Sequence, residues 1–97
     1  MGNRNFRVYL LLCRDGSLYC GITNDISRRL EIHNAGRGSK YTRSRLPVIL
    51  HASGCAMSKQ EALKLEYKIK HVRRQNKVAM LLKAKSSKRQ KKVDNRE

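Results

Sequence analysis

The strongest constraint on the fold is an Asp-Gly pair that stands between two short runs of β-forming residues. The runs cover residues 6–13 and 17–23, and both are rich in β-branched, aromatic and aliphatic side chains. Each run is also too short to make a good helix. Asp15-Gly16 supplies the positive φ angles that a tight turn between two antiparallel strands requires. The chain is therefore predicted to begin with a β-hairpin.

A helix is predicted directly after the hairpin. The segment 23–25 (Thr-Asn-Asp) offers three candidate N-caps for a helix over residues 26–34. Within it, Ile26 and Leu30 lie one turn apart and are expected to face the core. The glycine-containing segment 35–39 ends this helix and begins a loop that is expected to run to Leu46.

A third strand and a long helix complete the predicted domain. Pro47 restricts its neighbour to extended backbone, and Ser58 and Glu61 form a capping box in which each residue binds the other's amide. The elements predicted from these signals are a strand over residues 48–52, a long helix over 59–73 and a short final helix over 78–82. Because the capping box accounts for Glu61, this acid is not a candidate metal ligand.

These elements predict an α+β fold with one small domain. Its spine is a three-stranded mixed sheet, made of the N-terminal hairpin and one further strand, with helices packed against it in the order β-β-α-β-α and a possible last helix. The domain is expected to cover residues 6–82, after an N-terminal extension over 1–5. The basic segment 83–97 has almost no apolar content and is expected to be a disordered tail.

The charge of the chain predicts a polyanionic partner. Lys and Arg number 23 against 7 Asp and Glu, which gives a formal net charge of +16. The segment 83–97 holds seven basic and two acidic residues, so the first 82 residues still carry +11. A compact domain this basic repels itself unless a polyanion neutralises it, and the commonest polyanion is nucleic acid. No membrane partner is expected.

The cysteines predict a reducing environment. Cys13, Cys20 and Cys55 are odd in number, contain no C-x-x-C pair and lie in apolar surroundings, so they are interpreted as inert thiols. No His and Cys cluster has the spacing of a zinc site. With no secretory signal at the start of the sequence, the expected compartment is a cytoplasm of bacterial type.

Several polar and aromatic residues stand where an ordinary fold would not require them. Two tyrosines fall on the two predicted hairpin strands, and a glycine, an arginine, a histidine and a glutamate follow at set intervals. Glycine in a strand costs stability, so its presence there needs a reason. The set in chain order is Tyr9, Tyr19, Gly21, Arg29, His33 and Glu66.

This ordered set resembles the GIY-YIG nuclease domain over about residues 6–75. The first signature triad is represented by Arg7-Val8-Tyr9 and the second by Tyr19-Cys20-Gly21. The sequence is most similar to the small single-domain bacterial members of that family. The phrases that carry this likeness are Asp15-Gly16-Ser17-Leu18-Tyr19, Arg28-Arg29-Leu30 and Lys40-Tyr41-Thr42.

The resemblance implies a metal-dependent endonuclease that hydrolyses phosphodiester bonds. Glu66 would hold one divalent ion, Mg²⁺ or Mn²⁺, and Arg29 would bind the scissile phosphate through its planar fork of donors. Tyr9 or Tyr19 would take the proton of the attacking water or position that water, and the resemblance favours Tyr9. His33 stands where many relatives have a third tyrosine, and its imidazole could share or take the role of base. The three alternatives remain open at this stage.

Further residues are candidates for binding the substrate. Gly21 would allow the nucleic-acid backbone to approach without a side chain in the way. A basic loop with one tyrosine could follow a phosphate backbone, and its candidate residues are Arg37, Lys40, Tyr41 and Arg43. DNA is favoured over RNA as the partner. The alternative hypothesis is a non-catalytic nucleic-acid-binding module, for DNA or RNA, on the same scaffold.

Overall fold

The computed structural model describes residues 4–84 of the chain. Its helices and strands are β1 (Arg7–Leu12), β2 (Leu18–Thr23), α1 (Ile26–Asn34), α2 (Lys40–Arg43), β3 (Ile49–Ser53), α3 (Lys59–Lys70) and α4 (Arg74–Lys83). The predicted order of elements is confirmed, with α2 added. The start of the predicted N-terminal extension and the predicted tail beyond Ala84 lie outside the described residues.

The N-terminal hairpin forms as predicted, but its turn is one residue longer than the tightest type. Gly16 adopts a positive φ of 86°, whereas Asp15 keeps a negative φ. The Cys13 amide donates to the Ser17 carbonyl over 2.9 Å, and the Gly16 amide donates to the Cys13 carbonyl over 2.9 Å. This pattern is a three-residue loop that ends in a left-handed glycine. Asp15 contributes its carboxylate, which accepts the Ser17 amide at 3.0 Å.

The sheet is antiparallel throughout, and this corrects the expected mixed sheet. Its strand order is β2-β1-β3, and both β2 and β3 pair antiparallel with β1. β2 and β3 run in the same direction, so a parallel pair would form only if they were neighbours. Because β3 instead pairs with the central strand, the two same-direction strands are separated by β1.

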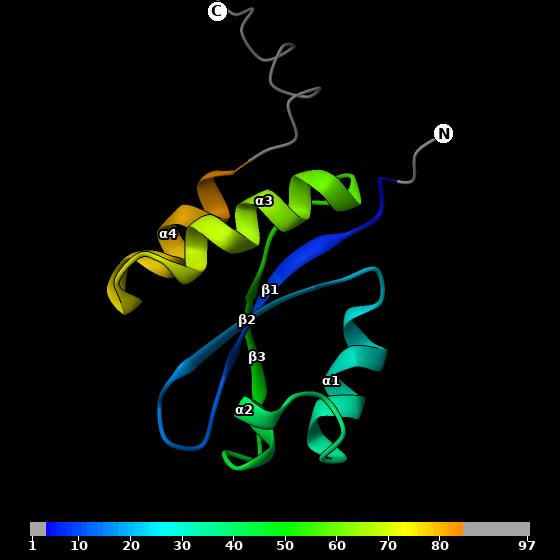
Figure 1. Cartoon of the computed structure of the whole chain (residues 1–97), viewed down its shortest axis with the longest axis vertical. Helices are drawn as coiled ribbons and strands as arrows, with labels where there is room; N and C mark the ends of the chain where they lie inside the picture. The colour runs from blue at the N-terminus through cyan, green and yellow to red at the C-terminus, as the bar shows by residue number, and fades with distance from the viewer. Residues whose placement is uncertain (1–3, 85–97) are drawn as a thin grey trace, which may run out of the picture.

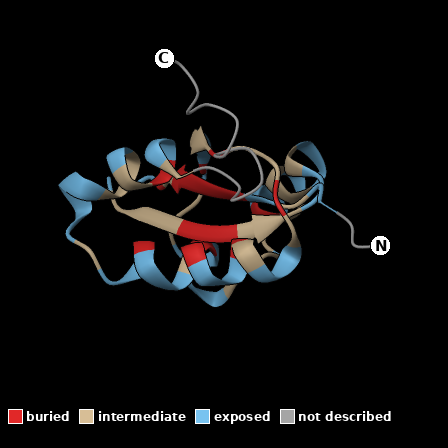
Figure 2. Cartoon of the chain, turned by 90° about the horizontal axis from the view of Figure 1, so that it is seen from above, coloured by how far each residue is buried: buried red, intermediate tan, exposed pale blue. Residues whose placement is uncertain are grey.

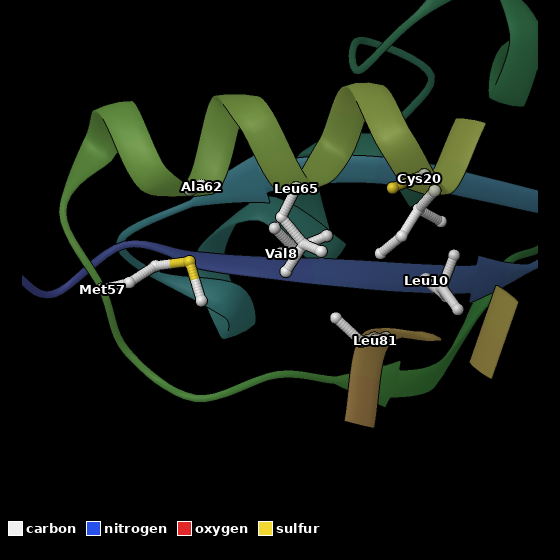
Figure 3. Close-up of a cluster of buried hydrophobic side chains, with 8 residues drawn as sticks. Val8, Leu10, Cys20, Met57, Ala62, Leu65 and Leu81 are labelled. Carbon is white, nitrogen blue, oxygen red and sulfur yellow. The ribbon is translucent and has the colours of Figure 1, made fainter. Parts of the chain in front are cut away.

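Both faces of β1 are buried, which divides the core into two parts. Val8 and Leu10 face a cluster that includes Leu65 of α3 and Leu81 of α4. Figure 3 shows these side chains gathered between β1 and the two helices. Tyr9 and the next alternate residues of β1 face the other way, into a second cluster with α1. Buried backbone accordingly runs through the middle of the molecule in Figure 2.

The helices form a layer on each side of the sheet. α3 and α4 lie together on one side of the strands, and α1 and α2 lie on the other (Figure 1). Ser58 and Glu61 form the predicted capping box at the start of α3. Among residues 4–84, no helix has the length and apolar character that crossing a membrane requires.

Three helices differ from the sequence predictions. The long helix α3 ends at Lys70, three residues before its predicted end. The segment expected to be a loop up to Leu46 contains the short helix α2, because the Ser39 side chain accepts the Thr42 amide and so caps it. α4 begins at Arg74, four residues before the predicted start. It is the burial of Leu81 that fixes this helix on the sheet, since Leu81 is fully buried whereas Leu82 is 58% exposed.

The packing of α4 predicts unequal effects for two adjacent leucines. Leu81→Ala is expected to lower the free energy of unfolding by about 2–5 kcal/mol, because it leaves a cavity between α4 and β1. Leu82→Ala is the matched control, and we expect a change of no more than about 0.5 kcal/mol at this exposed position. Urea denaturation of both variants checks the prediction, and equal losses would contradict the described packing of α4.

Candidate functional site

A tyrosine and a histidine are in contact between the sheet and α1. The Tyr9 hydroxyl lies 3.1 Å from Nε2 of His33, and both residues are buried, at 3% and 1% exposure. Tyr9 reaches this place because alternate side chains of β1 point to the α1 face. His33 reaches it from the last turn of α1. Two of the predicted site residues are therefore in direct contact, although they are 24 positions apart in the chain.

The other nitrogen of His33 is held by α2. Nδ1 lies 2.8 Å from the Thr42 hydroxyl, and that hydroxyl lies 3.3 Å from the Ser39 carbonyl oxygen. The Thr42 hydroxyl also lies 3.1 Å from the Ser39 hydroxyl. With the Thr42 proton assigned to the Ser39 carbonyl, which can only accept, Thr42 accepts from Nδ1–H. This assignment leaves Nε2 of His33 as the acceptor for the Tyr9 hydroxyl. The hydrogen bonds form one chain from Tyr9 through His33 and Thr42 to Ser39.

Two glycines, which have no side chain, leave room for the rings of Tyr9 and His33. A Cβ on Gly21, which faces Tyr9 across the strand pair, would stand 2.6 Å from the Tyr9 hydroxyl oxygen and 3.2 Å from the Tyr19 ring. A Cβ on Gly38 would collide with the His33 ring. Gly21 is itself buried. The described structure thus requires glycine at position 21 for the packing of Tyr9, while its role in substrate binding stays a prediction.

Burial keeps both members of the pair neutral. Burial raises the pKa of Tyr9 far above its ordinary value of 10.0, and the neighbouring Tyr19 raises it further, whereas the positive charge of Arg29 acts against this. Burial also lowers the pKa of His33 below its ordinary value of 6.5, and Arg29 lowers it further. In the free protein a neutral phenol therefore donates a hydrogen bond to a neutral imidazole, and no proton has been transferred between them.

Arg29 is the positive charge of this site. It lies on α1 one turn before His33, is half-buried, and acts electrostatically on both Tyr9 and His33. Arg29 also lines an open hollow between α1 and the start of α3, so part of its surface is accessible to a ligand.

An aromatic column extends from the buried pair to the surface. The Tyr19 ring centroid lies 5.1 Å from that of His33 and 6.0 Å from that of Tyr41, on which it stacks. The Arg45 guanidinium lies 3.8 Å above the Tyr41 ring and 2.9 Å from the Asp15 carboxylate. Arg45 therefore joins α2 to the hairpin turn, and Tyr41, with 37% exposure, is the outer end of the column.

The basic loop residues lie in α2 and just before it. Arg37, Lys40 and Arg43 are all exposed, and the last two are the first and last residues of α2. Because α2 packs on α1, these charges lie on the same layer as Tyr41 and Arg29. Their predicted role in binding a phosphate backbone stays a prediction.

Glu66 lies on the other layer. It belongs to α3, where its carboxylate is 3.2 Å from Lys70, one turn on. Burial raises the pKa of the Cys20 thiol to about 12, and the Glu66 carboxylate adds to this rise, so Glu66 acts on β2 from the α3 face. Tyr19, the neighbour of Cys20, points to the opposite face. The structure thus brings Tyr9, Tyr19, Arg29 and His33 together and places Glu66 across the edge strand from them.

A hydrated divalent ion fits the chemistry of Glu66 better than a fully protein-bound metal. Among residues 4–84, no three His, Cys, Asp or Glu side chains come together as a metal site. Mg²⁺ retains several of its waters and is commonly held by one or two carboxylates and a substrate phosphate. The single carboxylate of Glu66 is a suitable ligand of that kind, with Lys70 as its present partner.

Two supporting residues were not identified as such from the sequence. In the sequence Thr42 stands only within a phrase that resembles the family, and Arg45 is not among the residues predicted to form the site. The signal that could have pointed to Thr42 is its place three residues after Ser39, which is the spacing of an N-cap and the amide it binds. The contacts of Arg45 with Tyr41 and Asp15 depend on the tertiary fold.

Comparisons with known proteins show which proteins this chain is similar to. The model of the GIY-YIG catalytic domain matches residues 5–79. A UPF0213 protein of Bacillus licheniformis is 56% identical over 69 residues, which cover 71% of each chain. A UPF0213 protein of Bacillus pumilus is 50% identical over 70 residues, which cover 72% of this chain and 71% of that one.

Two solved structures are also similar. The solution NMR structure of protein EF2693 from E. faecalis has 33% sequence identity and a TM-score of 0.54, and the match covers 100% of this chain and 97% of that one. The solution NMR structure of the UPF0213 protein BH0048 from Bacillus halodurans has 47% identity and a TM-score of 0.47, with 74% and 77% of the two chains covered. The first supports the α+β fold described above.

The hydrogen-bond chain predicts that the hydroxyl group of Thr42 contributes more to stability than the volume of its side chain does. Thr42→Val keeps the shape but leaves Nδ1–H of His33 without its acceptor, which is expected to cost about 1–3 kcal/mol of stability. Thr42→Ser keeps the hydroxyl and is expected to cost less. Denaturation and the ¹⁵N shifts of the His33 ring check this. A valine variant with wild-type stability and unchanged ring shifts would disprove the assigned tautomer.

The lowered pKa of His33 predicts a loss of stability in acid. As the pH falls below 6.5, the unfolded chain binds a proton at this histidine before the folded chain does, so the free energy of unfolding decreases. Well above pH 6.5 the histidine is neutral in both the folded and the unfolded chain, so it causes no loss of stability there. Urea denaturation at pH 7.5 and 5.5 measures the decrease, which should be smaller in His33→Gln. His51→Gln, at an exposed position of β3, is the control and should retain the full decrease.

Proposed function

The chain belongs to the GIY-YIG catalytic domain family, and from this premise we propose that it is a metal-dependent endonuclease that hydrolyses phosphodiester bonds in DNA. The observation that carries the proposal is the contact between Tyr9 and His33 beside the charge of Arg29. The positive charge of Arg29 acts on both side chains, which suits a site that receives an anionic substrate. The strongly basic composition supports a nucleic-acid substrate.

Arg29 is proposed to bind the scissile phosphate. Its guanidinium offers a rigid fork of donors that matches two phosphoryl oxygens, and a half-buried position strengthens that interaction. Hydrolysis builds negative charge on the phosphoryl group in the transition state. A fixed positive charge at this point lowers the barrier because it does not have to reorganise during the reaction.

Tyr9 and His33 are proposed to act together as the general base. The Tyr9 oxygen takes the proton of the attacking water while its own proton passes to Nε2 of His33, 3.1 Å away. The phenol alone would be a poor base, because burial raises the pKa of Tyr9. The hydrogen bond from Nδ1 to Thr42 holds the imidazole in the orientation that accepts this proton. Tyr19 positions the substrate from the middle of the aromatic column, between His33 and Tyr41.

Glu66 is proposed to hold a hydrated Mg²⁺ or Mn²⁺ at the edge of β2. When bound, such an ion supplies positive charge for the leaving oxygen. Because β2 is an edge strand, a strand of nucleic acid that crosses this edge can contact Arg29 on one face and the surroundings of Glu66 on the other. Lys70 neutralises the carboxylate in the absence of the ion.

A second candidate function is nucleic-acid binding without cleavage. The observation that favours it is the separation of Glu66 from the other four residues by the edge strand, together with its ion pair to Lys70. In that case the basic residues around α2 would bind the phosphate backbone, and Glu66 would only support α3. The two candidates differ in whether Glu66 is needed for any effect on the substrate.

The proposed function predicts divalent-ion-dependent cleavage that depends on named side chains. Labelled single-stranded, duplex and branched DNA are incubated with Mg²⁺, with Mn²⁺ and with a chelator. Glu66→Gln is expected to abolish cleavage, Arg29→Ala to reduce the rate roughly 10²–10³-fold, and Tyr9→Phe roughly 10²–10⁴-fold. Arg29→Lys should recover little activity, because an ammonium group cannot replace the fork of donors.

The control is Glu31→Gln, which removes a carboxylate at an exposed position of α1 and should cleave at the wild-type rate. If every substrate stays intact with both ions, the endonuclease proposal fails. Nucleic-acid binding that persists in Glu66→Gln would then support the second candidate.

A further inference from the structure

An open hollow of about 470 Å³ lies beside Arg29 and is not used by the chemistry proposed above. We infer that it binds an unpaired nucleobase of the strand whose phosphate lies on Arg29. This inference rests on the proposed function and adds to it the class of substrate. It predicts that the enzyme acts where bases are unpaired, as in single strands, flaps and frayed ends.

The hollow lies where the two helix layers approach each other. It is lined by the turn from β2 into α1, by one side of α1, by Phe6 just before β1, and by Lys59, the first residue of α3. In Figure 1 the start of α1 and the start of α3 lie at the same end of the sheet. Arg29 is shared between this hollow and the Tyr9–His33 pair. A nucleotide with its phosphate on Arg29 therefore has its base next to the hollow.

The less exposed part of the lining is apolar and includes an aromatic ring. Phe6, Ile22 and Ile32 are each half-buried, so they present apolar surface to the hollow without filling it. The Lys59 ammonium lies 5.7 Å from the Phe6 ring centroid. A nucleobase has two flat π-faces, and stacking on an aromatic side chain is the usual way in which proteins hold an unpaired base.

The exposed part of the lining is polar and mainly positive. Arg28 and Lys59 are both exposed there. One oxygen of the Asp25 carboxylate accepts the Arg28 amide at 3.1 Å and so caps α1. Asn24 is exposed and has no hydrogen bond within the described residues, so its amide can donate to and accept from a base edge.

These features together match a nucleotide better than another small ligand. The volume falls in the lower part of the range for small-molecule sites. Its surface combines a ring for stacking, a free amide and flanking cations for the two neighbouring phosphates. A base in a continuous duplex is stacked on both sides and cannot enter such a hollow without being extruded.

The test measures binding without divalent ions, so that it does not depend on cleavage. Two labelled strands of equal length and charge are compared in a chelator by fluorescence anisotropy: a deoxyadenosine homopolymer and a fully abasic strand. Phe6→Ala is expected to weaken binding of the deoxyadenosine strand roughly 5- to 150-fold and to leave binding of the abasic strand unchanged. Arg29→Ala is expected to weaken both. A duplex of the same length should show no dependence on Phe6.

Two further variants keep the result interpretable. Leu63→Ala removes a 45%-exposed apolar side chain from α3 outside the hollow and should bind both strands like the wild type. Phe6→Leu keeps the apolar volume but removes the ring, and it decides the question if Phe6→Ala does not fold. Its loss should again be confined to the deoxyadenosine strand.

The inference is overturned if the Phe6 variants bind the deoxyadenosine strand like the wild type, or if they weaken both strands equally. Failure of cleavage with Mg²⁺ or Mn²⁺ is a separate outcome. It would end the endonuclease proposal and leave a base-dependent binding site in place.

Discussion

Burial of both faces of the central strand is the constraint on which the rest of the structure depends. Because successive side chains of a strand alternate, β1 places Val8 and Leu10 in one core and Tyr9 in the other. A shift of one residue in its pairing with β2 would exchange these faces and remove Tyr9 from Gly21. The apolar clusters thus fix the register of the sheet, and the register fixes the position of the phenol. Stability and the geometry of the site have the same cause.

The sheet also explains why the site has two parts. Tyr9, Tyr19, Arg29 and His33 share the α1 layer, whereas Glu66 shares the α3 layer with the core that holds Cys20. Only the edge strand β2 stands between them, and an edge strand has one unpaired side. A nucleic-acid strand that passes over this edge can reach both layers, as the proposed function requires.

Much of the fold could be predicted because its signals are local. Asp15-Gly16 marked the hairpin, and the capping box of Ser58 and Glu61 marked the start of α3 within one residue. The antiparallel pairing of β3 and the helix α2 were not predictable in this way. The first depends on which strand β3 meets, and the second is a single capped turn without a hydrophobic pattern.

The sequence predicted which residues belong to the candidate site more fully than it predicted the contacts between them. The family resemblance implied that Tyr9, Tyr19, Arg29, His33 and Glu66 form one site. The structure brings the first four together and leaves Glu66 on the α3 layer. Local sequence does not show that Thr42 holds the far side of the imidazole, because this contact joins two helices through a loop. It also does not show the hollow beside Arg29, which is formed by segments from both layers.

The charges around Tyr9 and His33 link substrate binding to the basicity of His33. Burial lowers the pKa of His33, and the charge of Arg29 lowers it further. A phosphate diester bound to Arg29 would offset that second cause, since its negative charge compensates the guanidinium. His33 would then accept a proton more readily in the complex than in the free protein, and the imidazolium that forms would lie near an anionic reaction centre. In the free protein burial and the same arginine together keep the histidine neutral, and the base becomes more effective when the substrate offsets the arginine's charge.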